Sequence, residues 1–250
     1  TIPFLIIYYL IILYIINQKL IMEEKIIKLG NRVLKDKLEN QGMRNKLIKE
    51  IENKGIKDQN VLKAMSAIPR HFFLPAGLEH FAYLDKPFDI GEGQTISQPY
   101  TVAFQTELLE VKPKIKILEI GTGSGYQAAV LSHMGAEVFT IERIEKLYLK
   151  AKELLTALGY NNVRCFLGDG YEGLEQYSPF DRIIITAAID EIPEKIKRQL
   201  AIGGILVAPI NNQSGIQIMH KIIRIDETNF NVEYHGSFSF VPMLPGIKKE

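Results

Sequence analysis

From residue 115 to residue 209 the chain alternates short apolar segments with amphipathic ones, and this alternation restricts the fold more than any other feature. Neighbouring parallel strands need a crossover connection, and an amphipathic helix supplies one. The pattern therefore predicts an α/β fold with a mostly parallel sheet and helices on both faces. The segments that we expect as strands are 115–120, 137–141, 163–167, 182–186 and 205–209.

The clearest predicted helix between these strands spans residues 145–158. Its leucines and alanine recur at helical spacing, and Gly159 follows as a C-terminal stop. Beyond residue 215 the helical patterns cease. Two strand-like segments, 216–225 and 230–240, are joined by a short polar turn. We expect them to form an antiparallel edge of the sheet.

The region before residue 115 has a different organisation. An amphipathic pattern begins at Met43 and resumes after Gly55, which predicts two helices that end at Pro69. Residues 71–98 contain many glycines and prolines and indicate an irregular lid or loop. Pro99, a favoured first helical residue, opens a further predicted helix.

Composition excludes several classes of protein. The 250 residues carry a formal net charge of +1, which gives no argument for nucleic-acid binding. Cys165 is the only cysteine, so an intrachain disulfide is impossible. The five histidines lie far apart in the sequence, so we expect no metal site and a reduced, cytoplasmic protein.

The N-terminal segment departs from this average. Residues 1–18 carry no charge, but the apolar run 4–16 is shorter than the roughly 20 residues of a spanning helix. Three interpretations stay open: a short membrane anchor, a partner-binding helix, or an upstream extension. Residues 23–42 are polar and predict a linker or a solvated helix. If the run inserts into a membrane, the lysines that follow it keep the rest of the chain cytoplasmic.

A glycine-rich turn, residues 121–125, follows the first predicted strand and opens a helix. Its spacing disfavours a dinucleotide, because the third glycine of that motif would fall at position 126, which is Tyr126. Glu119, two residues before the turn, disfavours a pyrophosphate. It suits a ligand with an ammonium group, such as the methionine end of S-adenosylmethionine.

Two more carboxylates follow the next two predicted strands. Glu142 lies where an acid can accept both ribose hydroxyls, and Asp169 lies where an acid can reach an adenine amino group. Each alone is more typical of a cap or a solvated turn. Together with Glu119 they stand at the carboxyl ends of three successive strands, the edge where open α/β sheets bind ligands.

From Met43 to about Met243 the sequence resembles the protein-L-isoaspartate O-methyltransferase family. The segments that carry the resemblance are IPRHF (68–72), IGEGQTISQPY (90–100), LEIGTGSGYQAAVL (118–131), TIERI (140–144), PFDRIIITAA (179–188) and FVP (240–242). The GTGSG segment is typical of all class I methyltransferases, whereas GQTISQPY is specific to this family. Residues 1–42 lie outside the resemblance, so we expect residues 43–250 to form the methyltransferase domain.

The resemblance implies a seven-stranded Rossmann-like domain that takes S-adenosylmethionine as methyl donor and releases S-adenosylhomocysteine. It also implies that the acceptor is the α-carboxyl group of an L-isoaspartyl residue in a damaged peptide, and that repair proceeds through a succinimide. Ser97 is then the catalytic residue, and residues 239–243 meet the peptide. The implied cofactor-binding residues are Thr95, Ile96, Ser97, Glu119, Gly121, Thr122, Gly123, Ser124, Gly125, Glu142, Arg143, Asp169, Gly170 and Gln217.

Ser97 has a second interpretation. A carboxylate acceptor is already an anion at neutral pH, so the reaction needs an orienting hydroxyl rather than a general base. From position alone, however, a serine two residues before Pro99 is more typical of a helix cap.

Two further functions stay open at this stage. One is a class I methyltransferase retargeted to RNA or a small molecule, which the intact ISQP segment (96–99) disfavours. The other is a binding module that holds the cofactor without catalysis, tethered to a membrane through residues 1–18. We expect a monomer that acts on isoaspartyl peptides and proteins and does not bind nucleic acid.

Overall fold

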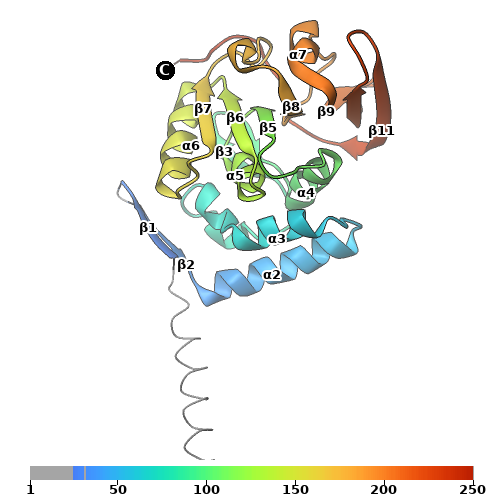
Figure 1. Cartoon of the computed structure of the whole chain (residues 1–250). Coiled ribbons are helices and arrows are strands. Elements are labelled where there is room, and N and C mark those ends of the chain that lie inside the picture. The colour runs from blue at the N-terminus through green and yellow to red at the C-terminus, as the bar shows by residue number, and fades with distance from the viewer. Residues whose placement is uncertain (1–24, 31, 250) are drawn as a thin grey trace, which may run out of the picture.

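The computed structural model describes residues 25–30 and 32–249 (Figure 1). The apolar run expected at residues 1–18 lies outside this range. None of the helices in the described residues is long and apolar enough to span a membrane.

A seven-stranded sheet in the order β11-β10-β9-β8-β5-β6-β7 forms the centre of the domain. Strands β5 to β9 are parallel, while β10 and β11 run antiparallel along one edge. The predicted α/β class, the parallel strands and the antiparallel edge are confirmed. The strands are β5 (Lys116–Ile120), β6 (Glu137–Glu142), β7 (Val163–Leu167), β8 (Phe180–Ile185), β9 (Leu200–Asn211), β10 (Gln217–Arg224) and β11 (Phe230–Phe238).

Helices cover both faces of this sheet, and each face has its own apolar core. One core joins the sheet to α4, α5 and α6, with side chains such as Val102, Leu131 and Leu154 buried together. The other core joins the opposite face to α7, where Ile196 is fully buried. The helices are α2 (Leu38–Asn53), α3 (Gln59–Ala67), α4 (Pro99–Leu108), α5 (Tyr126–His133), α6 (Glu145–Ala157) and α7 (Glu194–Gln199).

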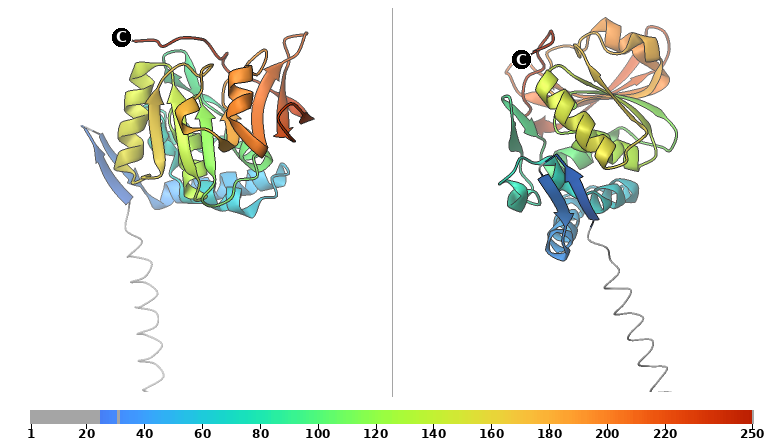
Figure 2. Two further views of the ribbon diagram at one scale, coloured as in Figure 1. Left: turned by 45° about the horizontal axis from the view of Figure 1, so that its top comes forward. Right: turned by 90° about the vertical axis from the view of Figure 1, so that its left-hand side faces the viewer.

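Helices α2 and α3 form a further layer against α4 and α5 (Figures 1 and 2). The connection from α3 to α4 was expected as an irregular lid, and it contains more regular structure than that. Short 3₁₀ turns at Arg70–Phe73 and Glu79–Phe81 precede a hairpin of β3 (Phe88–Gly91) and β4 (Gln94–Ile96). The hairpin brings residues 95–97 to the carboxyl edge of the main sheet.

The expectation of a linker or solvated helix for residues 23–42 is wrong over most of the described part. Strands β1 (Lys25–Leu29) and β2 (Arg32–Asp36) form an antiparallel hairpin, and α2 begins at Leu38 rather than at Met43. Alternation along β2 explains the hairpin, because Leu34 and Asp36 are buried while Val33 and Lys35 are exposed. The hairpin contacts α6 (Figure 2).

A buried polar cluster ties this hairpin to the domain. The Arg44 guanidinium donates to both carboxylate oxygens of Asp36, at 3.0 and 2.9 Å. It also donates to the Tyr83 hydroxyl at 3.0 Å, which lies 2.7 Å from Nδ1 of His71. Nε2 of His71 lies 3.0 Å from the carbonyl oxygen of Lys35. The division of the chain at residue 43 stays a prediction, but the structure connects both sides of it.

The Asp36–Arg44 pair gives a first prediction. Replacing Asp36 with Asn leaves the buried Arg44 guanidinium without its counter-charge. We therefore expect the free energy of unfolding to fall by about 3–5 kcal/mol. A chain shortened to begin at residue 43 loses the same partner and should be similarly destabilised. Denaturant unfolding followed by circular dichroism measures both effects.

The matched control is Glu194→Gln, which removes the exposed pair between Glu194 and Lys197. That change should alter stability by less than about 1 kcal/mol. Equal stabilities for Asp36→Asn and the control would mean that the buried pair does not hold the hairpin in place.

Candidate active site

The site lies where the order of the strands reverses. Strand β5 is central, and the chain continues first to β6 and β7 on one side, then returns to β8 on the other. The connections that leave the carboxyl ends of β5 and β8 therefore diverge, which opens a crevice in folds of this type. Thr186 follows β8 and reaches across, its hydroxyl 3.0 Å from the carbonyl oxygen of Ile120 and 2.7 Å from that of Gly121.

Two glycines of the turn after β5 are required by close approach. Gly121 has φ +98°, and a Cβ there would lie 2.5 Å from the Thr186 hydroxyl oxygen. Gly125 has φ +86°, and its Cβ would lie 3.1 Å from Leu155 on α6. The first glycine thus lets β5 and β8 approach each other, and the second lets α5 pack on α6.

The Glu142 carboxylate fixes the shape of this turn. One oxygen accepts a hydrogen bond from the Gly123 N–H at 2.8 Å, and the other accepts from the Ile144 N–H at 2.9 Å. Burial raises the pKa of Glu142, and these two backbone donors oppose the shift. The end of β6 is thereby joined to the turn after β5.

A narrow cavity of about 90 Å³ lies along these strand ends. Most of the residues expected at the cofactor line it. They are Thr95, Ile96, Ser97, Gly121, Thr122, Gly123, Ser124, Glu142, Arg143 and Gly170. Glu119, Gly125, Asp169 and Gln217 were also expected there but do not line the cavity, and each has a different environment.

Glu119 is completely buried beneath the cavity. Neither of its carboxylate oxygens has a hydrogen-bond partner among the described residues. Burial raises the pKa of Glu119 to about 8, and the charge of Glu142 adds to the shift. The hydroxyl of Thr140 lowers the pKa of Glu119 and so opposes this shift. That hydroxyl also hydrogen-bonds with the hydroxyl of Thr122, at 2.6 Å. Burial therefore favours the neutral, protonated form of the Glu119 carboxyl group.

Asp169 is held by the main chain instead of facing the cavity. One of its oxygens accepts from the Tyr171 N–H at 2.9 Å and the other from the Gly246 N–H at 2.7 Å. The C-terminal segment that contains Gly246 crosses above the ends of β7 and β6 (Figures 1 and 2). Arg143 donates to the carbonyl oxygens of Gly246 and Pro245, at 3.0 and 3.3 Å. This segment therefore covers one end of the cavity.

Gln217 lies in a neighbouring groove rather than in the cavity. Its side chain binds the main chain of Phe240, accepting from the N–H and donating to the carbonyl oxygen at 3.1 Å. Its position supports a role in fixing the segment 239–243, which faces the groove and the cavity.

Ser97 does not cap α4. The helix receives its cap from a distant residue, because the Asp85 carboxylate accepts from the Tyr100 N–H at 2.8 Å and from the Gln98 amide at 3.0 Å. The Ser97 hydroxyl makes no hydrogen bond within the described part of the chain, and it borders both the cavity and the groove. The structure thus leaves this hydroxyl available for a ligand.

A buried arginine holds the backbone of Ser97. Arg70 donates to the carbonyl oxygen of Ser97 at 2.8 Å and to that of Ala82 at 3.0 Å. Its guanidinium lies 4.8 Å from the ring centre of Tyr126, which lines the cavity. Burial lowers the pKa of Arg70 to about 10, so the group stays charged at pH 7.

Two further cavity residues were not expected from the sequence. Thr186 was assigned only to a strand. Gln127 was seen only as part of the GTGSGYQ segment. Gln127 is buried, and its amide donates to the Thr106 hydroxyl at 2.9 Å, whereas its Oε1 has no partner in the described residues. Only the three-dimensional structure shows that this unpaired acceptor belongs to a residue of the cavity wall.

Comparison with known proteins identifies the family. The sequence profile of the family Protein-L-isoaspartate(D-aspartate) O-methyltransferase matches residues 41–248. The chain belongs to the protein-L-isoaspartate O-methyltransferase family. The hairpin of β1 and β2 lies outside the matched range.

Individual members of the protein-L-isoaspartate O-methyltransferase family agree with this. The enzyme of Flavobacterium psychrophilum is 54% identical over 211 residues, which is 84% of this chain and 98% of that protein. The enzyme of Dictyoglomus thermophilum is 47% identical over 208 residues, which is 83% of this chain and 94% of that protein.

Solved structures confirm the fold. A protein-L-isoaspartate O-methyltransferase that is 32% identical superposes with a TM-score of 0.75 and covers 82% of this chain and 67% of its own. A candidate member of the same family from Plasmodium falciparum was solved in complex with S-adenosyl-L-homocysteine. It is 23% identical and has a TM-score of 0.71, covering 80% of this chain and 98% of its own.

Glu119 gives a prediction for the dependence of stability on pH. A carboxyl whose folded pKa is about 8 binds its proton more tightly in the folded than in the unfolded state. Below the unfolded pKa of about 4.4 the carboxyl is protonated in both states, so Glu119 has no pH-dependent effect on stability. Between that pH and about 8 the unfolded state releases the proton more readily, so the free energy of unfolding falls as the pH rises. Above about 8 the loss is constant. We expect Glu119→Gln, which cannot ionise, to lose less stability than the wild type between these limits.

Melting temperatures of both proteins from pH 4.5 to pH 9 test this. As the pH rises, the melting temperature of Glu119→Gln should increase by several degrees relative to that of the wild type, and this difference should then level off. A difference that stays constant across this range would show that Glu119 ionises normally in the folded protein.

Proposed function

We propose that this chain transfers a methyl group from S-adenosylmethionine to the α-carboxyl group of L-isoaspartyl residues in damaged proteins and peptides. Family membership supports the reaction, and one observation supports its location. Ser97, whose hydroxyl has no hydrogen-bond partner among the described residues, stands at the boundary between the narrow cavity and the larger groove. A donor in the cavity and an acceptor in the groove would meet at this residue.

The residues of the cavity fit S-adenosylmethionine. Glu142 offers a carboxylate at the strand end for ribose hydroxyls, while Ile141 and Ile144 supply apolar walls for a purine. The unpaired Oε1 of Gln127 is an acceptor suited to an ammonium group. Buried and unpaired polar atoms are rare in folded proteins, so this acceptor indicates a missing partner.

The chemistry requires little from the protein beyond placement. When bound, S-adenosylmethionine supplies an electrophilic methyl group on a sulfonium centre. The acceptor carboxylate is an anion at pH 7 and needs no general base. Ser97 would orient one carboxylate oxygen toward the cavity, and Arg70 would keep the Ser97 backbone in position. Alignment of this kind can account for several kcal/mol of the barrier.

The product explains repair. A methyl ester is a better leaving group than the free acid, so the neighbouring amide nitrogen closes a succinimide and expels methanol. Hydrolysis of the succinimide regenerates part of the population as normal aspartate. Methylation thus returns the displaced main-chain bond to its original place in a fraction of the molecules.

The cellular setting belongs to the proposal as well. We place the enzyme in the cytoplasm as a monomer that acts on isoaspartyl proteins and peptides and does not bind nucleic acid. The presence of a single cysteine supports a reducing compartment. The net charge of +1 provides little electrostatic attraction for the phosphates of a nucleic acid. Any membrane contact would come from residues 1–18.

Ser97 gives the central prediction. Ser97→Ala should lower turnover on an isoaspartyl peptide by about a hundredfold, because misplacement of the acceptor by about 1 Å has such an effect. The melting temperature should stay within about 2 °C of wild type, since Asp85 rather than Ser97 caps α4. Calorimetric affinity for S-adenosylhomocysteine should change little.

Ser178→Ala is the matched control, because Ser178 is partly buried like Ser97, lines neither the cavity nor the groove, and donates its hydroxyl to the Glu175 carbonyl oxygen. It should keep wild-type turnover. A drop in turnover for Ser97→Ala that is explained by loss of folded protein would remove the orienting role. Equal wild-type rates on aspartyl and isoaspartyl peptides would remove the repair function itself.

Glu142 and Gln127 give a prediction for binding alone. Glu142→Gln keeps the shape of the side chain but replaces one acceptor oxygen with an NH2 group, so it loses charge-assisted hydrogen bonds to the ligand and to the Gly123 or Ile144 N–H, each worth ~1.5–3 kcal/mol. We expect at least tenfold weaker binding of S-adenosylhomocysteine, measured by calorimetry. Gln127→Leu should weaken it severalfold. Glu137→Gln, at the exposed start of the same strand, is the control and should bind normally. Unchanged affinity in both test variants would place the cofactor elsewhere.

A further inference from the structure

A groove of about 890 Å³ adjoins the narrow cavity on the side of the antiparallel sheet edge. The two share Thr95, Ser97, Thr186 and Val241 as lining residues, so the groove is continuous with the proposed point of methyl transfer. Its volume is within the range of sites that bind drug-sized ligands, roughly 300–1,000 Å³. The groove therefore has room for residues beside the methylated one.

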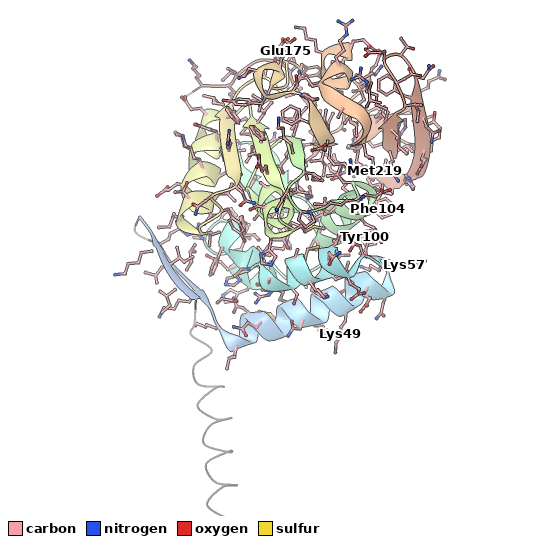
Figure 3. The ribbon with its side chains drawn as sticks, in the orientation of Figure 1. Lys49, Lys57, Tyr100, Phe104, Glu175 and Met219 are labelled. Carbon is pink, nitrogen blue, oxygen red and sulfur yellow. The ribbon has the colours of Figure 1, made fainter. Side chains whose placement is uncertain are left out.

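Aromatic side chains from two elements form its apolar wall. Tyr100 and Phe104 lie on α4 and are labelled in Figure 3. Phe238 and Phe240 come from the end of β11 and the segment after it. The ring centres of Phe104 and Phe238 are 5.2 Å apart, and those of Tyr100 and Phe104 are 5.8 Å apart. All four side chains are only partly buried, so they present ring surface to the groove.

The groove carries no ionisable lining residue apart from the Tyr100 phenol, among the residues that the structure describes. Its polar groups are neutral hydroxyls and amides, which are suited to hydrogen bonds with a peptide backbone of any sequence. They belong to Gln98, Thr101, Gln217, Ser237 and Ser239. The side chains of Gln98, Thr101 and Gln217 already make hydrogen bonds within the protein, whereas the Ser237 and Ser239 hydroxyls have no partner among the described residues and are available to a peptide.

We propose that this groove binds the side chain next to the isoaspartyl residue and selects large apolar or aromatic neighbours over charged ones. The inference rests on the proposed function and names the class of peptide on which it acts best. Tyr100, Phe104 and Phe238 are then specificity-determining residues. The backbone of the peptide is held by the neutral polar groups of the rim.

The preference follows from desolvation. An aromatic neighbour loses unfavourable contact with water and gains ring contacts at offset or edge geometry. A charged neighbour loses hydration, and the groove offers no counter-charge to compensate. A single methylene group in an apolar pocket already changes kcat/KM by about 10- to 200-fold. We expect at least tenfold here.

The test uses the full chain and isoaspartyl hexapeptides that differ at one position. The residue directly before the isoaspartyl, and in a second series the residue directly after it, is Phe, Leu, Gly, Lys or Glu. In at least one series kcat/KM should decrease from Phe and Leu through Gly to Lys and Glu. The Gly peptide measures the basal reaction, so its methylation shows that the proposed function holds whatever the ranking.

Variants locate the preference. Phe104→Ala and Phe238→Ala should each reduce the Phe-to-Gly ratio of kcat/KM at least threefold and leave the affinity for S-adenosylhomocysteine unchanged. Tyr234→Ala is the control, because Tyr234 lies on β11 but is 71% exposed and outside the groove. Ser237→Lys places a charge on the exposed rim and should raise kcat/KM for the Glu peptide severalfold relative to the Lys peptide.

Each outcome separates the two proposals. Methylation of the Gly peptide with equal kcat/KM for all neighbours, or with a preference for a charged neighbour, would overturn the groove assignment and leave the function intact. A Phe preference that survives in both alanine variants would place the selecting surface elsewhere and overturn it too. No methylation of any isoaspartyl peptide by a folded protein that binds the cofactor would overturn the function.

Discussion

The contact between Thr186 and the last residues of β5 is the constraint on which the site depends. It joins β5 to β8 at the point where the chain reverses its direction across the sheet. Because Gly121 has no side chain, the two strand ends approach closely and the connections beyond them diverge. The Glu142 carboxylate then holds the glycine turn from the opposite side through Gly123. The cavity is thus shaped by the backbone before any ligand binds.

Ser97 reaches this cavity from a segment that has no place in the main sheet, and buried polar side chains bring it there. The Asp85 carboxylate accepts a hydrogen bond from the backbone N–H at the start of α4, and the Arg70 guanidinium donates one to the Ser97 carbonyl oxygen. Both interactions are made by the backbone, and within residues 25–30 and 32–249 the Ser97 hydroxyl makes no hydrogen bond. From its position alone Ser97 was compatible with capping, but the carboxylate of Asp85, 12 residues earlier in the sequence, takes that role.

The sequence predicts the parts of this structure that local patterns determine. The alternation of apolar and amphipathic segments predicts all the parallel strands and the antiparallel edge. Each segment has a hydrophobic periodicity that is typical of either a strand or a helix. The hairpins of β1–β2 and β3–β4 escape this reasoning, since their strands are short and gain stability from tertiary contacts such as Asp36 with Arg44. The position of Asp169 could not be predicted either. A carboxylate at a strand end can serve a ligand or a distant backbone, and only the path of the C-terminal segment decides between them.

That C-terminal segment also borders the cavity, which Met243 and Leu244 help to line. The cavity volume of about 90 Å³ is below the roughly 300 Å³ at the lower limit of typical ligand sites. The segment is held by Asp169 and Arg143 at one end and by the ion pair of Lys248 with Glu92, on the tip of the β3–β4 hairpin, at the other. Main-chain hydrogen bonds add to these contacts, because the Lys248 N–H donates to the Arg143 carbonyl oxygen at 2.8 Å and the Lys248 carbonyl oxygen accepts from the Glu145 N–H at 3.0 Å. The hairpin tip and the C-terminal segment therefore both contact the residues that follow β6, next to Glu142 and the cavity.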